Sequence, residues 1–217
     1  MAAGFRKTSD LPQVIPVFPL DGALLLPHGT LPLNIFEPRY LNMIDDALAA
    51  ERVVGMVQTV NGGSRDRPRL AQVGCAGKIT SFAETPDGRY LISLTGLCRF
   101  GVGQEILVQT PYRQIRAEYA AFASDLRPLM DDDGFDRIHF LTALKAYLDH
   151  RQLEIDWDAA REAPGEALVS SLAMALPFDN AEKQALLEAG TLSERRQALI
   201  ALLEIDATDD DEPSLLQ

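Results

Sequence analysis

The segment LPLNIFEPRYLNMIDDAL, residues 31–48, contains the change of hydrophobic period that decides how the chain folds. Its first part is a short apolar run interrupted by proline, which is typical of a strand. Its second part places apolar residues at helical spacing, namely Tyr40, Leu41, Ile44, Ala47 and Leu48. Pro38 suits the first turn of a helix, where its missing N–H costs nothing. We therefore predict a strand and, directly after it, a helix of about four turns.

The junction between this strand and helix holds an unusual group of side chains, here called the EPRY motif: Phe36, Glu37, Pro38, Arg39 and Tyr40. A functional interpretation makes Glu37 an acid or base and Arg39 an anion holder. A structural interpretation turns the Glu37 carboxylate toward the positive helix N-terminus, pairs Arg39 with it or with backbone carbonyls, and buries the Tyr40 ring. We favour the structural interpretation, because the sequence offers no second catalytic group, and we expect a clamp that is largely buried.

The rest of the first 120 residues indicates strands separated by turns. QVIPVFPL contains Pro16 and Pro19, so we expect an edge strand or one that leaves the sheet quickly. Asn61-Gly62-Gly63 predicts a flexible loop between two antiparallel strands, and Pro86-Asp87-Gly88 predicts a turn. YRQIRAEYAAF is the last expected strand. Many short strands at close spacing favour a small barrel or sandwich.

The remainder of the chain is helical in pattern. Four helices are expected, in FDRIHFLTALKAYLDH, GEALVSSLAMAL, DNAEKQALLEAG and TLSERRQALIALLEI. Asp179 is the expected cap of the third helix, and Thr191 with Glu194 matches a capping box for the fourth. We predict an α+β protein with a β domain over residues 1–122, a helical bundle over 123–207 and a disordered acidic tail over 208–217.

Composition and charge exclude several classes of protein. The 217 residues are 47% hydrophobic and 24% charged, which are ordinary values for a globular protein. No stretch approaches the roughly 20 apolar residues of a membrane helix, and MAAGFRKTSD lacks a signal peptide's apolar run, so we expect a cytoplasmic protein. Residues 1–120 carry 12 Lys+Arg and 11 Asp+Glu (+1), whereas residues 121–217 carry 8 and 21 (−13). This acidic half argues against a nucleic-acid backbone as the partner.

Several segments resemble known catalytic, cofactor-binding or metal-binding motifs, but their residue types or spacing do not match those motifs. GVGQEI lacks the third glycine of a dinucleotide fingerprint, and Gly77-Lys78 is followed by isoleucine rather than by the Ser or Thr of a P-loop. LMDDDGF does not place carboxylates where a calcium loop needs them. Cys75 and Cys98 have no companion at metal spacing and are expected to be buried. We therefore predict no enzyme, no cofactor and no metal.

Three blocks of the sequence resemble one known family. IPVFPLDGALLLPHGTLPLNIFEPRYLNMIDDAL, QVGCAGKITSFAETPDGRYLISLTGLCRFGV and PYRQIRAEY are similar, in this order, to the substrate-binding N-terminal domain of Lon protease. The helical segment LPFDNAEKQALLEAGTLSERRQALIALL is similar to the bundle that follows in that domain. One departure is His28, which separates Pro27 from Gly29 where the family often reads Pro-Gly.

The resemblance implies a PUA-like β pseudo-barrel followed by a small helical bundle, and recognition of polypeptide rather than bond cleavage. It implies that the EPRY motif is a structural family motif. The failed P-loop and the short chain predict a stand-alone domain without the ATPase and protease modules of Lon. Unfolded or degron-bearing polypeptides are the implied partners, with a protease as a further candidate partner.

Two places are candidates for binding. One is the junction of the β domain with the helices, since domain interfaces favour clefts. The other is the loop NGGSRDRPRL, in which Arg65, Arg67 and Arg69 form a locally basic segment. An RNA- or small-ligand-binding PUA-like protein is the main alternative function, and a small enzyme that uses Cys75 or Cys98 with a histidine is the weakest hypothesis.

Overall fold

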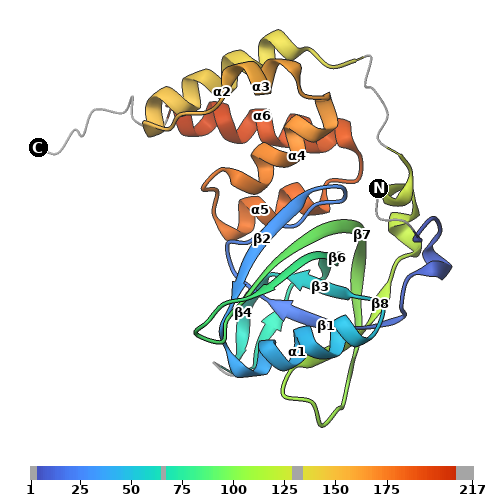
Figure 1. Cartoon of the computed structure of the whole chain (residues 1–217). Helices are drawn as coiled ribbons and strands as arrows, with labels where there is room; N and C mark the ends of the chain where they lie inside the picture. Colours follow the sequence, from blue (N-terminus) through green and yellow to red (C-terminus); the bar gives the residue numbers. More distant parts are fainter. Residues whose placement is uncertain (1–3, 65–66, 129–133, 209–217) are drawn as a thin grey trace, which may run out of the picture.

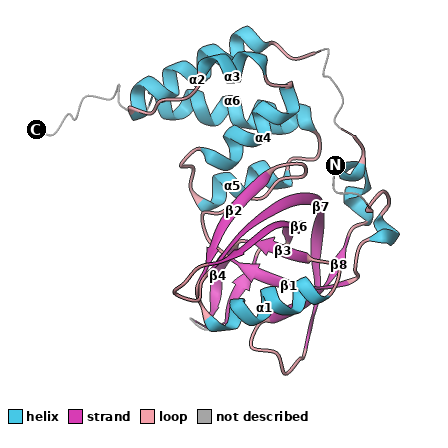
Figure 2. Ribbon diagram, viewed as in Figure 1, coloured by secondary structure: helices cyan, strands magenta, loops and turns pink. Residues whose placement is uncertain are grey.

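A computed structural model of the chain describes residues 4–64, 67–128 and 134–208. The strands and α1 occupy one part of the molecule and the helices α2 to α6 the other, so the predicted α+β class is confirmed (Figures 1 and 2). The strands are β1 (Val14–Pro19), β2 (Thr30–Ile35), β3 (Val53–Val57), β4 (Thr59–Ser64), β5 (Arg67–Leu70), β6 (Val73–Glu84), β7 (Tyr90–Ile106) and β8 (Arg113–Glu118). The helices are α1 (Pro38–Ala49), α2 (Arg137–Arg151), α3 (Trp157–Glu162), α4 (Gly165–Ala175), α5 (Asn180–Glu188) and α6 (Leu192–Thr208), with the 3-10 helices η1 (Thr8–Asp10) and η2 (Ala120–Leu126).

Six strands form a mixed sheet in the order β2-β7-β6-β3-β1-β8. The pairing of β1 with β3 is parallel, and the sheet's other pairings are antiparallel. β7 is 17 residues long, and irregular registers along it allow its first half to pair with β2 and its second half with β8. Because β7 also pairs with β8, the sheet rolls back on itself, as expected for a pseudo-barrel. β2 pairs only with β7, outside the rolled part, so the strands do not form a regular closed barrel.

The structure differs from the sequence-based expectation in three elements. β1 is an interior strand between β3 and β8, so the expectation of an edge strand is wrong. The strand has only six residues, which agrees with the alternative that it leaves the sheet quickly. The expected flexible loop at residues 61–68 is largely a two-stranded ribbon of β4 and β5, in which the register shifts between Val60 and Gly63. Helix α3 was not predicted, because six residues are too few to show a helical period.

Helix boundaries followed local sequence signals more closely. Pro38 lies at the start of α1, as expected. Asp179 and Glu182 exchange side-chain and backbone hydrogen bonds at the start of α5, and Thr191 and Glu194 do the same at the start of α6. These reciprocal bonds satisfy N–H groups that have no partner within the helix, so the predicted caps are confirmed. In the described residues no helix is both long and apolar enough to cross a membrane.

Buried side chains line both faces of the rolled sheet. One hydrophobic cluster joins the sheet to α1 and to the helices α2 to α6, and the other lies on the opposite face. Cys75 belongs to the first cluster and Cys98 to the second, and both are fully buried, as predicted. Burial raises the pKa of Cys98 to about 12 and that of Cys75 well above its usual value. Both groups are therefore thiols at neutral pH, which argues against a nucleophilic role.

The segment before β2 lies directly against β7 at a glycine. His28 donates its N–H to the carbonyl of Gly96 at 2.9 Å, and Gly96 donates to that of Gly29 at 2.8 Å. A Cβ at position 96 would lie 2.0 Å from the carbonyl oxygen of Leu26, so this approach requires glycine. His28 adopts a left-handed φ of 64° in this turn.

A buried arginine on β7 connects the sheet to the helical part. The Arg99 guanidinium donates to both carboxylate oxygens of Asp125 at 2.8 Å, and these side chains are only 4% and 7% exposed. It also donates to the carbonyls of Leu187, Ala189 and Gly190. These carbonyls lie in and just after the last turn of α5, where the helix dipole favours a positive charge.

A second arginine supports the same helix end. Arg195, on α6, is buried and donates its Nε–H to the carbonyl of Leu186 at 2.9 Å. Burial, with a smaller effect of nearby Arg99, lowers the pKa of Arg195 to about 10, so the group remains charged at neutral pH. The last turn of α5 is thus held by two guanidinium groups, one from each part of the molecule.

We predict that Arg99→Met lowers the free energy of unfolding by about 3 to 5 kcal/mol, because it leaves the Asp125 carboxylate buried without its partner. Urea denaturation followed by circular dichroism measures the change. Arg161→Met is the control, since Arg161 pairs with Asp158 in an exposed ion pair on α3 and its loss should cost less than about 1 kcal/mol. Equal effects of the two substitutions would contradict the assignment of Arg99 as the main polar connection.

Candidate functional site

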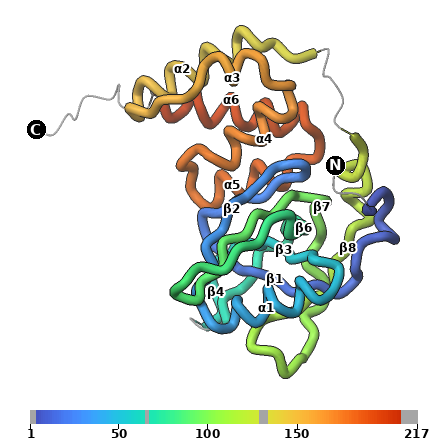
Figure 3. Tube along the Cα trace, in the orientation of Figure 1, coloured from blue at the N-terminus to red at the C-terminus, as the bar shows by residue number. Residues whose placement is uncertain are grey.

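A groove of about 640 Å³ lies where four segments of the β part meet. Its lining comes from the end of β1, the start of α1, the β4–β5 ribbon and the loop that joins β7 to β8. This loop extends past α1 in the tube view (Figure 3). The lining residues are Pro19, Leu20, Asp21, Arg39, Tyr40, Thr59, Arg67, Pro68, Glu105, Ile106, Leu107, Val108, Thr110, Pro111, Tyr112 and Arg113.

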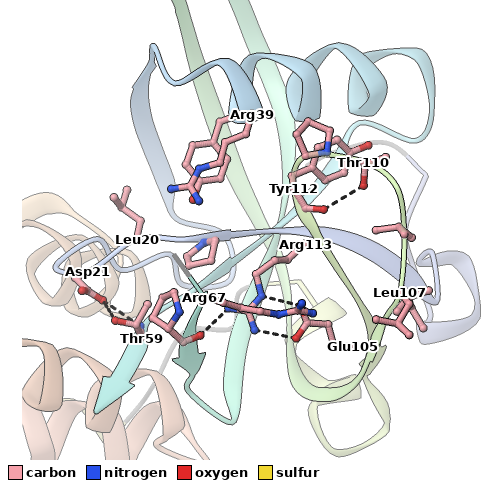
Figure 4. A pocket seen from close by; sticks show the side chains of 16 residues that line it. Leu20, Asp21, Arg39, Thr59, Arg67, Glu105, Leu107, Thr110, Tyr112 and Arg113 are labelled. Carbon is pink, nitrogen blue, oxygen red and sulfur yellow. Dashed lines mark hydrogen bonds and ion pairs between the residues drawn. The ribbon is translucent and has the colours of Figure 1, made fainter. Parts of the chain in front are cut away.

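Glu105, near the end of β7, organises the charged side of the groove (Figure 4). It accepts hydrogen bonds from Arg113 at 2.8 and 2.9 Å and from Arg67 at 2.8 Å. Arg113 also donates to the carbonyl of Pro68 at 2.7 Å, which holds the ribbon against β8. The hydrogen bonds from Arg113, assisted by its charge and by Arg67, lower the pKa of Glu105 despite partial burial. Glu105 is therefore a carboxylate shared by two arginines.

Arg39 and Tyr40 of the EPRY motif form a second side of the groove, but the motif is not arranged as expected. Arg39 donates its Nε–H to Glu37 at 2.9 Å, and both side chains are 45% exposed, so the prediction of a buried pair is wrong. Glu37 makes no side-chain cap to the helix. The Tyr40 ring is buried as predicted, with its centroid 4.2 Å from that of Phe18, and the Arg39 guanidinium lies 4.5 Å above it. The motif is thus a buried aromatic anchor that carries an exposed ion pair.

The third side of the groove is apolar and exposed. Leu107 is 91% exposed at the start of the β7–β8 loop, and its neighbour Val108 is 40% exposed. The end of this loop is fixed by Tyr112, whose hydroxyl donates to Asp46 on α1. Burial is the main reason that the pKa of Tyr112 rises to about 12, so its hydroxyl retains its proton for this bond. A large apolar side chain is thereby held in solvent on an anchored loop.

The structure brings together residues that the sequence analysis treated separately. Arg67 lies on β5 and lines the groove, opposite Arg39 of the EPRY motif. Arg69 lies on the same strand but not in the lining, Phe36 is exposed outside it, and Arg65 lies outside the described residues. The sequence analysis did not identify Glu105, Leu107 or Arg113, and an available signal was the apolar pair Leu107-Val108 just before the expected last strand.

The junction between the sheet and the helices, the other predicted candidate, is closed by direct contacts. Lys183 of α5 donates to the carbonyl of Gly22 at 2.7 Å, and Gln184 donates to that of Val73 at 3.1 Å. Arg99 crosses the same junction. In the part of the chain that the structure describes, no group of three or more side chains of the metal-ligating types is found.

Comparison with known proteins identifies relatives over most of the chain. The model of the family described as "ATP-dependent protease La (LON) substrate-binding domain" matches residues 14–204. Lon protease of Roseiflexus castenholzii is 27% identical over 202 residues, which cover 90% of this chain and 24% of that protein. Lon protease of Anaeromyxobacter dehalogenans is 30% identical over 126 residues, covering 57% of this chain and 14% of that protein. The chain therefore spans only a minor part of the length of these relatives.

Solved structures show the same fold. A Lon N-terminal domain protein from Xanthomonas campestris superposes with a TM-score of 0.62 at 23% identity, covering 87% of this chain and 97% of that one. The N-terminal domain of Lon protease from Mycobacterium avium complex gives a TM-score of 0.62 at 18% identity, covering 91% of this chain and 99% of that one. These two likenesses extend through both the sheet and the helices.

We predict that Tyr40→Ala and Arg39→Ala differ strongly in their effect on stability. Loss of the buried ring should lower the free energy of unfolding by about 3 to 5 kcal/mol, as for other buried aromatic residues. Loss of the exposed Arg39–Glu37 pair should cost less than about 1 kcal/mol. Denaturant titration of both variants measures the difference, and a cost above 2 kcal/mol for Arg39→Ala would restore the buried-clamp interpretation.

Proposed function

Because the chain belongs to the family of ATP-dependent protease La (LON) substrate-binding domains, we propose that it binds polypeptide segments and holds them in the groove beside α1. The observation that carries this proposal is Leu107, a large apolar side chain that is 91% exposed on the wall of the groove. Unfolded segments expose apolar side chains that folded proteins bury, and burial of one such side chain stabilises a complex by about 1.5 to 3 kcal/mol.

The proposed binding is not coupled to bond cleavage by this domain. Cys75 and Cys98 are buried thiols with raised pKa values, and Glu105 in the groove is held by Arg113 and Arg67. We propose an accessory or adaptor role in protein quality control in the cytoplasm, in which the domain presents unfolded or degron-bearing polypeptides to a protease. We also propose that the β domain ends near residue 122 and the helical bundle near residue 207.

RNA or a small ligand is the alternative occupant of the groove. The groove contains three arginines, which favours an anion. Against a phosphate backbone, which is bound by several cations, Arg113 is engaged by Glu105 and Arg39 by Glu37, and the protein carries a net charge of −12. The exposed Leu107 is also better suited to an apolar side chain than to a sugar–phosphate chain.

We predict that a fluorescently labelled, permanently unfolded polypeptide binds the purified domain, and that Leu107→Ser weakens this binding about tenfold, because one apolar contact is lost. Fluorescence anisotropy measures the affinity. Ile138→Ser is the matched control: Ile138 is 82% exposed on α2, in the helical part, and its replacement should leave the affinity unchanged.

A labelled single-stranded RNA is titrated in the same way. Absence of binding to the unfolded polypeptide, or equal weakening by both serine substitutions, would refute the groove as the polypeptide site. Salt-sensitive RNA binding without polypeptide binding would establish the alternative function instead.

A further inference from the structure

Charge is unevenly matched within the groove. Arg67 and Arg113 approach one carboxylate, that of Glu105, so this cluster carries one positive charge in excess. The other carboxylate of the lining, Asp21, instead accepts from the backbone N–H and the hydroxyl of Thr59, at 3.0 and 2.7 Å. The unmatched charge therefore lies on the ribbon side of the groove.

Arg67 is the member of this cluster that can accept a new partner. Its side chain is 55% exposed, whereas that of Arg113 is 19% exposed. Within the described residues, the Arg67 guanidinium makes one hydrogen bond, from Nη2 to Glu105, while Arg113 uses three of its donors. A guanidinium has five N–H donors in a planar fork that matches a carboxylate, so Arg67 retains donors for a second anion.

The backbone beside this cluster indicates the shape of the partner. β1 pairs with β8 only from Val14 to Val17, and its last residues, Phe18 and Pro19, pair only with β3 among the described strands. Pro19 and Leu20 line the groove. The edge of a strand that lacks a neighbour over a short length accommodates an extended chain better than a helix.

We propose that the groove selects extended polypeptide segments in which a carboxylate lies next to an apolar side chain. The carboxylate, from Asp, Glu or a free C-terminus, binds Arg67, and the apolar side chain contacts Leu107 and Val108, which line the groove beside the Glu105 cluster. This inference rests on the proposed polypeptide-binding function and adds a charge preference to it.

The test uses three labelled peptides with the same Phe-Leu core, flanked by Glu, by Gln or by Lys. Titrated against the full chain, the Glu peptide should bind about 3-fold more tightly than the Gln peptide, which is within the range for partly exposed ion pairs. It should bind about 10-fold more tightly than the Lys peptide, because a lysine adds a repulsion of similar size. This preference should diminish as salt is added. A Glu peptide and its C-terminal amide analogue separate side-chain carboxylates from a free C-terminus.

Substitutions assign the preference to one side chain. Arg67→Gln should abolish the difference between the Glu and Gln peptides, and Arg67→Lys should retain part of it, because the charge remains while the planar fork is lost. Arg161→Gln, which removes an exposed arginine from the helical part, should leave the preference unchanged. Circular dichroism of Arg67→Gln checks that the ribbon is still folded.

The outcomes separate this inference from the function on which it rests. Equal, Leu107-dependent binding of all three peptides would overturn the charge preference and leave polypeptide binding in place. A preference that survives Arg67→Gln would overturn the role of Arg67. Binding of RNA but of none of the peptides would overturn both proposals.

Discussion

The buried guanidinium of Arg99 is the interaction on which the arrangement of the two parts depends. It lies on β7, binds both oxygens of Asp125 just after the sheet, and reaches the carbonyls that end α5. A charge that is 4% exposed must be paired and hydrogen-bonded to be tolerated, and here one side chain meets this requirement only if sheet, η2 and α5 are all in place. Arg195 adds a second guanidinium at the same helix end. The junction is therefore filled by structural bonds, whereas the groove beside α1 remains open.

The groove arises from the way the sheet rolls. Because β7 is long and irregular in register, its second half carries Glu105 to β8, where Arg113 and the ribbon's Arg67 converge on it. The same turn of the chain exposes Leu107, and Tyr112 ties the loop to α1 through Asp46. The end of β7 and the loop that follows it thus form both the charged wall and the apolar wall of the groove. The two walls lie side by side, so one extended segment could contact both, which supports both proposals.

Features set by local sequence could be predicted, and features set by long-range pairing could not. The start of α1 at Pro38 and the boxes at Asp179 and Thr191 depend on bonds within four residues, so the sequence predicted them. The family resemblance also allowed the fold as a whole to be predicted. The Arg67–Glu105 contact joins residues 38 positions apart through a register shift that no local signal marks, and the Arg99 contacts join residues about 90 apart. The EPRY motif shows a second limit of sequence-based prediction. The sequence offered a Glu37–Arg39 pair as one of two alternatives and led us to expect it buried, whereas the pair is exposed.

Hydrogen–deuterium exchange of the domain, with and without a saturating unfolded polypeptide, tests the central claim most directly. A segment held in the groove should slow amide exchange in the loop of residues 107–112, in the described part of the ribbon and in the first turn of α1, while α2 to α6 remain unchanged. Protection confined to the helical part, or no protection anywhere in the presence of bound polypeptide, would contradict the assignment of the groove as the binding site.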